Sequence, residues 1–176
     1  MTARIRPASP AEAAALHELA ALTFPLACPP STTEASKAAF IAEHLSAAAF
    51  DRYLNDAERE VFVADDAGQL VGYAMVVHGE PADPDVARAV RARPTAELSK
   101  LYVHPLHHGG GVASALVAAV VDAASRRHAA SVWLGVNQHN ARANRFYAKS
   151  DFATVGSKRF LVGDTYEDDW VRERAL

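Results

Sequence analysis

Residues 97–114 read ELSKLYVHPLHHGGGVAS, and this stretch decides the fold. Its first seven residues favour a strand over 97–103, which ends at a turn containing three glycines. Beyond the turn, apolar residues recur at helical spacing and predict a helix over 112–127 whose one face packs on a sheet. That face comprises Val112, Leu116, Val120 and Ala123. A strand, a glycine turn and an amphipathic helix in this order are typical of an α/β protein.

Strands and helices continue to alternate toward the C-terminus. The pattern predicts a strand at 131–136, a helix at 140–150 and two further strands. Upstream, we expect a strand at 3–8 and then a helix that is capped by Ser9-Pro10 and ended by Pro25. A loop at 28–33 should lead to a helical region at 34–54 that breaks near 45–47. We then expect a hairpin of antiparallel strands at 60–65 and 70–77, followed by a long surface loop at 79–94.

Length and composition limit the classes of protein. The 176 residues are 50% hydrophobic, which is enough for one core, so we expect a single domain over 1–176. A net charge of −3 without a basic cluster argues against nucleic acid as a partner. The only cysteine, Cys28, excludes an internal disulfide and fits a reducing compartment, so we expect the cytoplasm. No apolar run approaches the roughly 18 residues of a membrane span, so we expect no membrane attachment.

The glycines at 109–111 favour a phosphate site. Glycine permits positive φ and leaves backbone N–H groups uncovered, and the following helix adds its own unpaired N–H groups. Such a corner binds phosphate, although glycines after a strand can equally form only a tight turn. A phosphate-loop NTPase would need Lys and then Ser or Thr where this chain has Val112-Ala113. A dinucleotide fingerprint lacks the acidic residue that the next strand should provide.

These residues resemble the GNAT superfamily of N-acetyltransferases. The acyl-CoA motif of that superfamily, Gln/Arg-x-x-Gly-x-Gly/Ala, corresponds to residues 108–113, HGGGVA. Its second signature, Asn-x-x-Ala-x-x-Phe-Tyr-x-x-x-Gly-Phe, corresponds to residues 140–152, NARANRFYAKSDF. The two matches together cover about 97–152. More loosely, the acidic segment 160–170 is similar to the ending of spermidine and spermine N-acetyltransferases.

The resemblance implies a fold and a cosubstrate. The fold would be a mixed α/β (α+β) sheet of six to seven strands with flanking helices and a splay between the fourth and fifth strands. Acetyl-CoA would bind in the splay, with pantetheine pairing along the fourth strand and the N–H of Leu101 facing the acetyl carbonyl. The resemblance assigns these positions to the cofactor: Leu101, Tyr102, Val103, His108, Gly109, Gly110, Gly111, Val112, Ala113, Ser114, Asn140 and Tyr147.

Two catalytic roles also follow from the resemblance. Glu97 stands where several members carry the general base, and strand alternation would place it on one face with Ser99, Leu101 and Val103. A surface ion pair is the alternative for its carboxylate. Tyr147 would protonate the departing CoA thiolate, with a rim aromatic as the alternative. Asn140 would cap its helix, bind the cofactor, or do both.

Some positions depart from the family pattern. His108 replaces Gln or Arg, so we expect its contact with the diphosphate to weaken as pH rises from 6 to 8. Asp151 replaces a glycine and would alter only a turn. His104, His107 and His108 invite a metal site, but no carboxylate or cysteine stands at ligand spacing, so we expect none.

The acceptor is the least determined part. The acidic segment favours a polyamine-like small molecule, although acidic hairpins are usually only solvated. An amino acid or a protein N-terminus remains open as acceptor, and so does a non-catalytic acyl-CoA sensor. The family often forms homodimers, but no exposed apolar stripe of this chain identifies an interface.

Overall fold

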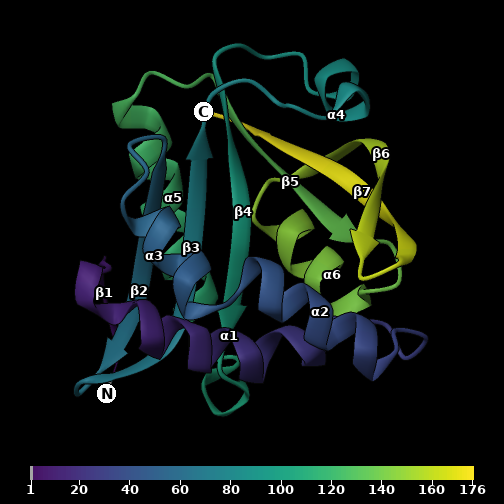
Figure 1. Cartoon of the computed structure of the whole chain (residues 1–176). Helices are drawn as coiled ribbons and strands as arrows, with labels where there is room; N and C mark the ends of the chain where they lie inside the picture. Colours follow the sequence, from purple (N-terminus) through teal and green to yellow (C-terminus); the bar gives the residue numbers. More distant parts are fainter. Residues whose placement is uncertain (1) are drawn as a thin grey trace.

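A computed structural model describes residues 2–176 as one mixed seven-stranded sheet flanked by helices (Figure 1). The strand order is β1-β2-β3-β4-β5-β7-β6, and all neighbours are antiparallel except β4 and β5. The strands are β1 (Arg4–Pro7), β2 (Arg59–Asp66), β3 (Gln69–His78), β4 (Thr95–Val103), β5 (Ser131–Asn137), β6 (Ala153–Val162) and β7 (Thr165–Ala175). The predicted α/β class and strand number are confirmed.

Six α-helices surround the sheet in the described part of the chain. They are α1 (Ala13–Ala27), α2 (Glu34–His44), α3 (Ala47–Leu54), α4 (Pro84–Ala89), α5 (Val112–Arg126) and α6 (Ala141–Lys149). Short 3-10 turns, η1 (Pro10–Glu12) and η2 (Pro105–His107), precede α1 and follow β4. Ser9 caps η1 in a capping box with Glu12, as its position before Pro10 predicts. The helical region 34–54 breaks into two helices at 45–46, also as predicted.

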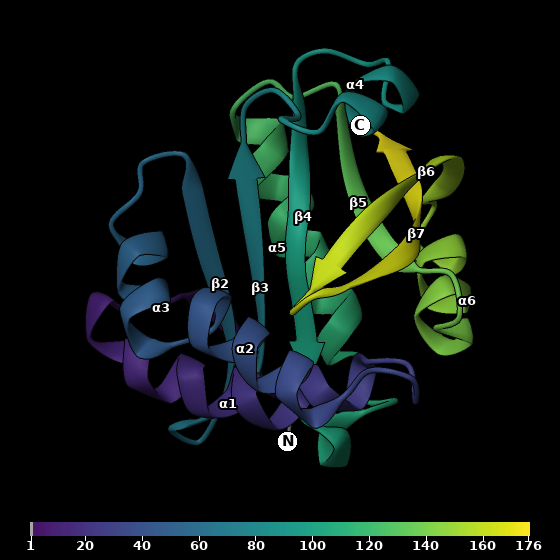
Figure 2. The same cartoon turned by 45° about the vertical axis from the view of Figure 1, so that its right-hand side comes forward.

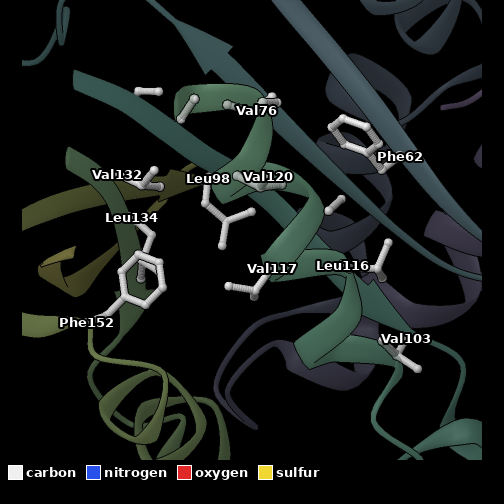
Figure 3. Close-up of a cluster of buried hydrophobic side chains, with 14 of the residues drawn as sticks. Phe62, Val76, Leu98, Val103, Leu116, Val117, Val120, Val132, Leu134 and Phe152 are labelled. Carbon is white, nitrogen blue, oxygen red and sulfur yellow. The ribbon is translucent and has the colours of Figure 1, made fainter. Parts of the chain in front are cut away.

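Each face of the sheet carries its own core, and Figure 3 shows the core on the side of α5. Helix α5 covers one face, and its predicted apolar positions are all buried there against strand residues such as Phe62, Val76 and Leu98. Helices α1, α2 and α3 cover the opposite face, where Leu16, Phe50 and Tyr73 are buried. Burying an apolar side chain stabilises the fold by about 1.5–3 kcal/mol. The two cores therefore fix α1 and α5 on opposite sides of β4.

The parallel strands β4 and β5 separate along their length (Figure 2). Their pairing is confined to three positions at the start of both strands, Thr95–Glu97 with Ser131–Trp133. Beyond Glu97, β4 still pairs with β3 as far as Val103, whereas β5 continues beside β7. The splay between the fourth and fifth strands is therefore confirmed, and it leaves one edge of β4 without a neighbouring strand.

A β-bulge in β4 corrects the prediction that Glu97 shares a face with Leu101. Along β3, Met75 pairs with Lys100 and the adjacent Val76 pairs with Leu98, so Ser99 is the extra residue. Directly opposite residues share a face, and a bulge shifts the alternation by one. Leu98, Leu101 and Val103 consequently face α5, whereas Glu97, Lys100 and Tyr102 face the side of α1 and α2.

Two other predictions were wrong. Pro25 does not end α1, which continues to Ala27, because proline lacks only its own N–H and its carbonyl still accepts from Cys28 N–H at 3.3 Å. The expected long loop at 79–94 contains the six-residue helix α4, capped by the Asp83 side chain. Tertiary packing stabilises this short helix, because Val86 and Val90 are buried against Trp133 of β5.

None of the described helices combines the length and the apolar character that a membrane crossing requires.

Candidate active site

A cavity of about 640 Å³ lies where β4 and β5 separate. Its walls come from the end of α1, the outer half of β4, the start of α5, the end of β5, helix α6 and the hairpin of β6 and β7. All predicted cofactor positions line it except Gly110, and Glu97 lines it as well. The fold thus brings together residues that are distant in sequence, while the roles assigned to them remain predictions.

The glycine corner forms one end of this cavity. Gly109 and Gly111 have φ angles of 79° and 83°, which side-chain-bearing residues rarely adopt. A Cβ atom at either glycine would meet no heavy atom within 4 Å, so the backbone there is open to a ligand. Gly111 immediately precedes α5, and no side chain caps that end of the helix. The first N–H groups of α5 therefore have no side-chain partner, and their residues 112–114 line the cavity, an arrangement that suits phosphate oxygens.

His108 stands between a backbone carbonyl and Arg142. Its Nε2 lies 2.8 Å from the Val103 carbonyl oxygen, so Nε2 carries the hydrogen and donates it. Its Nδ1 lies 2.6 Å from Nη1 of Arg142 and accepts from the guanidinium. Both ring nitrogens therefore have partners in this structure, and the expected pH-dependent contact with diphosphate stays a prediction. Arg142, which the sequence motifs did not single out, is the permanent cation at this corner.

Helix α6 carries the second signature, and its N-cap Asn140 and its Tyr147 are among the residues that line the cavity. Asn140 accepts from Ala143 N–H at 3.1 Å through Oδ1, so its predicted capping role is confirmed. Tyr147 packs edge-on against Phe152 with 5.9 Å between the ring centroids. Burial raises the pKa of the Tyr147 hydroxyl well above its usual value, so the group keeps its proton at every physiological pH.

Glu97 is a half-buried carboxylate at the inner wall, on the last residue of β4 that pairs with β5. Burial raises its pKa, and the nearby cations Lys158, Lys100 and Arg59 only partly oppose this effect. Among the described residues it forms no ion pair or side-chain hydrogen bond, so the expected alternative of a surface ion pair is not found. An unpaired carboxylate with a raised pKa has the properties of a general base.

A second carboxylate is Asp169 of β7, which lies in the predicted acidic segment 160–170 but was not singled out as a site residue. It is 5% exposed, lines the cavity, and its Oδ1 has no hydrogen-bond partner in the described structure. Burial raises its pKa to about 6. A Cβ atom on Gly135 would lie 2.6 Å from Cε of Lys158 and 3.2 Å from Oδ2 of Asp169, so both side chains lie over this glycine. The strands separate there, and Gly135 leaves room for the two charged groups.

A smaller cavity of about 290 Å³ adjoins the first on the side of α2. Glu97, Ser99, Tyr102 and Phe160 line both cavities, so Glu97 stands at their junction. The remaining lining residues are Phe40, His44, Leu45, Lys100 and Leu161.

The three histidines near the corner do not converge on a common point. His104 uses Nδ1 to accept from Leu106 N–H at 3.2 Å, and its ring centroid is 6.0 Å from that of His107. No group of three potential ligands suited to a metal ion occurs within residues 2–176. Cys28 lines the larger cavity as a free thiol, and burial raises its pKa to about 11, which disfavours the thiolate form at neutral pH.

The sequence of this chain is similar to those of known acetyltransferases. A family model described as Acetyltransferase (GNAT) family matches residues 14–152. A protein of Mycobacterium tuberculosis (strain ATCC 25618 / H37Rv), named as an uncharacterized N-acetyltransferase, is 44% identical over 161 residues, which cover 92% of this chain and 96% of that protein.

Solved structures show the same fold. The PaiA N-acetyltransferase of Thermoplasma acidophilum, in complex with coenzyme A, superposes with a TM-score of 0.79 at 17% identity over 100% of both chains. YncA of Salmonella typhimurium, solved with acetyl-CoA, superposes with a TM-score of 0.66 at 22% identity over 100% of this chain and 95% of that one. Both similarities concern the fold alone.

Proposed function

Because the chain belongs to the Acetyltransferase (GNAT) family of N-acetyltransferases, we propose that it transfers the acetyl group of acetyl-CoA to a primary amine of a small molecule. One observation carries this proposal. The gap between β4 and β5 opens beside the glycine corner, and an unpaired carboxylate, Glu97, stands at its inner wall. A cosubstrate with a diphosphate at one end and a reactive thioester at the other fits such a site.

We assign the two ends of the cavity to different parts of acetyl-CoA. The N–H groups of residues 109–114 and the Arg142 guanidinium bind the diphosphate, with His108 positioning Arg142. Pantetheine lies along the edge of β4 at 101–103, where no strand pairs with it, and Asn140 contributes from the start of α6. The PaiA and YncA structures, which contain coenzyme A and acetyl-CoA, support this choice of ligand.

The chemistry follows from the order of groups along the cavity. Glu97, directly or through a water molecule, takes a proton from the acceptor ammonium, and the free amine attacks the thioester carbonyl carbon. The Leu101 N–H stabilises the resulting oxyanion, an interaction worth roughly 3 kcal/mol in other acyl transfers. When the C–S bond breaks, the thiolate takes the hydroxyl proton of Tyr147. The former amine nitrogen then gives its second proton to the Tyr147 phenolate, and the neutral amide leaves. All groups act within one ternary complex.

The sequence preference for a polyamine acceptor has mixed support. Of the acidic residues in the β6–β7 hairpin, Glu167 and Asp169 line the cavity, whereas Asp164 and Asp168 are exposed. Lys158 lies among the lining carboxylates and reduces their attraction for a polycation. We therefore define the acceptor first as a small primary amine, and we keep polyamines as one arm of the test.

A sensor that binds acyl-CoA without transfer is the competing function. Thiol release from acetyl-CoA, measured with a panel of amines and with the product identified by mass, separates the two. We expect turnover with at least one amine and a loss of kcat of about 10²-fold or more in Glu97→Gln and Tyr147→Phe. Retained coenzyme A binding in both variants is the control. Binding without product from any amine would favour the sensor.

The cellular setting is part of the proposal. The free, half-buried Cys28 supports a reducing compartment such as the cytoplasm. A homodimer is consistent with the family resemblance, and the solution mass of the protein would test it.

A further inference from the structure

We propose that the acceptor is an amino acid with an apolar or aromatic side chain, and that Lys100 binds its carboxylate in the smaller cavity while Glu97 receives its amine. This inference rests on the acetyl transfer proposed above and specifies its acceptor. It assigns a function to Lys100 and to the smaller cavity, which meets the larger cavity at Glu97.

The bulge at Ser99 creates this arrangement. In a regular strand, residues three apart point to opposite faces, so Glu97 and Lys100 would be separated by the sheet. The extra residue places both side chains on the face of α1 and α2, and both line the smaller cavity. A ligand at this junction therefore meets a carboxylate and an ammonium group a short distance apart. An α-amino acid carries the complementary pair, an ammonium and a carboxylate separated by one carbon.

Lys100 has no internal partner for its charge. The neighbouring Arg59 pairs with Asp56 at 3.1 Å, whereas no described carboxylate forms an ion pair with Lys100. Its Nζ lies 5.4 Å from the centroid of the Tyr53 ring, a contact that orients the ammonium without neutralising it. Burial lowers the pKa of Lys100 to about 8, although Glu97 opposes this shift. An anionic ligand would compensate for the lost solvation, which a second cationic group cannot do.

The rest of the smaller cavity selects the side chain. Phe40 lies with its ring centroid 5.6 Å from that of Phe160 and 4.7 Å from that of His44, and Leu45 and Leu161 complete an apolar wall. A volume of about 290 Å³ has room for one large side chain. A polyamine would place its second ammonium against Lys100 and apolar rings, so the cavity disfavours it.

The test compares two acceptors that differ at one group. L-Phenylalanine and L-phenylalaninamide have the same amine and side chain, but the amide lacks the carboxylate. We expect kcat/KM for the acid to exceed that for the amide by about tenfold or more, because the amide leaves Lys100 unpaired. The intrinsic chemistry favours the amide, whose amine loses its proton more easily, so a preference for the acid must come from the site. Spermidine is the third acceptor and should be poorer than the acid.

A substitution assigns the preference to Lys100. In Lys100→Met, the ratio of kcat/KM for acid over amide should fall to about one, with the amide little changed, and Lys100→Arg should retain part of the ratio. Lys149→Met, which changes an exposed lysine at the end of α6, should keep the wild-type ratio. Calorimetric binding of coenzyme A verifies that each variant is folded.

Three results would overturn the inference. They are an amide acetylated as well as the acid by the wild type, an equal loss for both acceptors in Lys100→Met, and spermidine as the best acceptor. The comparison of the acid with the amide in the wild-type protein tests the inference even if Lys100→Met does not fold. A failure of acetyl transfer itself is recognised separately, because then no amine of the whole panel yields a product although coenzyme A binds.

Discussion

At the scale of single residues, the raised pKa of Glu97 has a measurable consequence. A base must be unprotonated, so kcat/KM should fall as pH decreases through this pKa, which lies above the usual value of about 4.3. Glu97→Gln should remove this acidic limb together with most of kcat. The measurement is a pH–rate profile with two amines of different basicity, because only a limb that belongs to the enzyme stays in place.

The control for Glu97 is another carboxylate. Glu58 is exposed and pairs with Arg127 at 3.4 Å, away from both cavities. Glu58→Gln should keep the wild-type profile. An acidic limb that survives in Glu97→Gln would refute the assignment of the base.

Arg142 gives a second residue-scale prediction. If its guanidinium binds the diphosphate, Arg142→Met should raise KM for acetyl-CoA about tenfold, which is ~1.4 kcal/mol, with kcat nearly unchanged. The effect should diminish at high salt because the interaction is electrostatic. Arg145→Met, an exposed neighbour on α6 that does not line the cavity, is the matched control. Equal KM values for the two variants would remove Arg142 from the site.

Some candidate site residues can be identified from sequence motifs, and others only from the structure. Glu97, Tyr147 and the glycines lie in local motifs, so their positions in the sequence already indicated them. Lys100, Lys158 and Asp169 come from three strands whose adjacency depends on the sheet order, and no local pattern distinguishes them from surface charges. Arg142 lies inside a recognised signature, but only its contact with His108 shows that it faces the corner.

At the scale of elements, the corner before α5 requires glycine at particular positions. Gly111→Ala would force an alanine into a φ of 83°, which costs about 1–2 kcal/mol or moves the backbone N–H groups. We expect a lower thermal midpoint and weaker binding of coenzyme A. Gly110→Ala is the control, because its φ is not in the left-handed region and its Cβ would lie at an ordinary 3.5 Å from the His107 carbonyl oxygen. Both variants are measured by thermal unfolding and coenzyme A titration, and equal effects would contradict the argument.

Elements with a regular spacing of apolar residues were predicted well, whereas features that depend on contacts with other elements were not. Helix α5 and strands β2 and β3 follow local patterns, and their limits agree within one or two residues. The bulge at Ser99 depends on the pairing of β4 with β3, which alternation within one strand cannot show. Helix α4 has a local start signal in Asp83-Pro84, but six residues are too few for a helical period.

At the scale of the whole molecule, the sheet should unfold as one unit. The two cores lie on opposite faces of the same strands, so neither can open without exposing the other. We expect a single calorimetric transition whose van't Hoff and calorimetric enthalpies agree. Two separate transitions would contradict the prediction of one domain.

The splay between β4 and β5, together with the glycine corner, should form a coenzyme A site. Titration calorimetry of the wild-type protein with coenzyme A tests it most directly. We expect saturable binding of one coenzyme A per chain, weakened in Gly111→Ala more than in Gly110→Ala. A titration that shows no heat, together with no rise in the thermal midpoint at saturating coenzyme A, would contradict it.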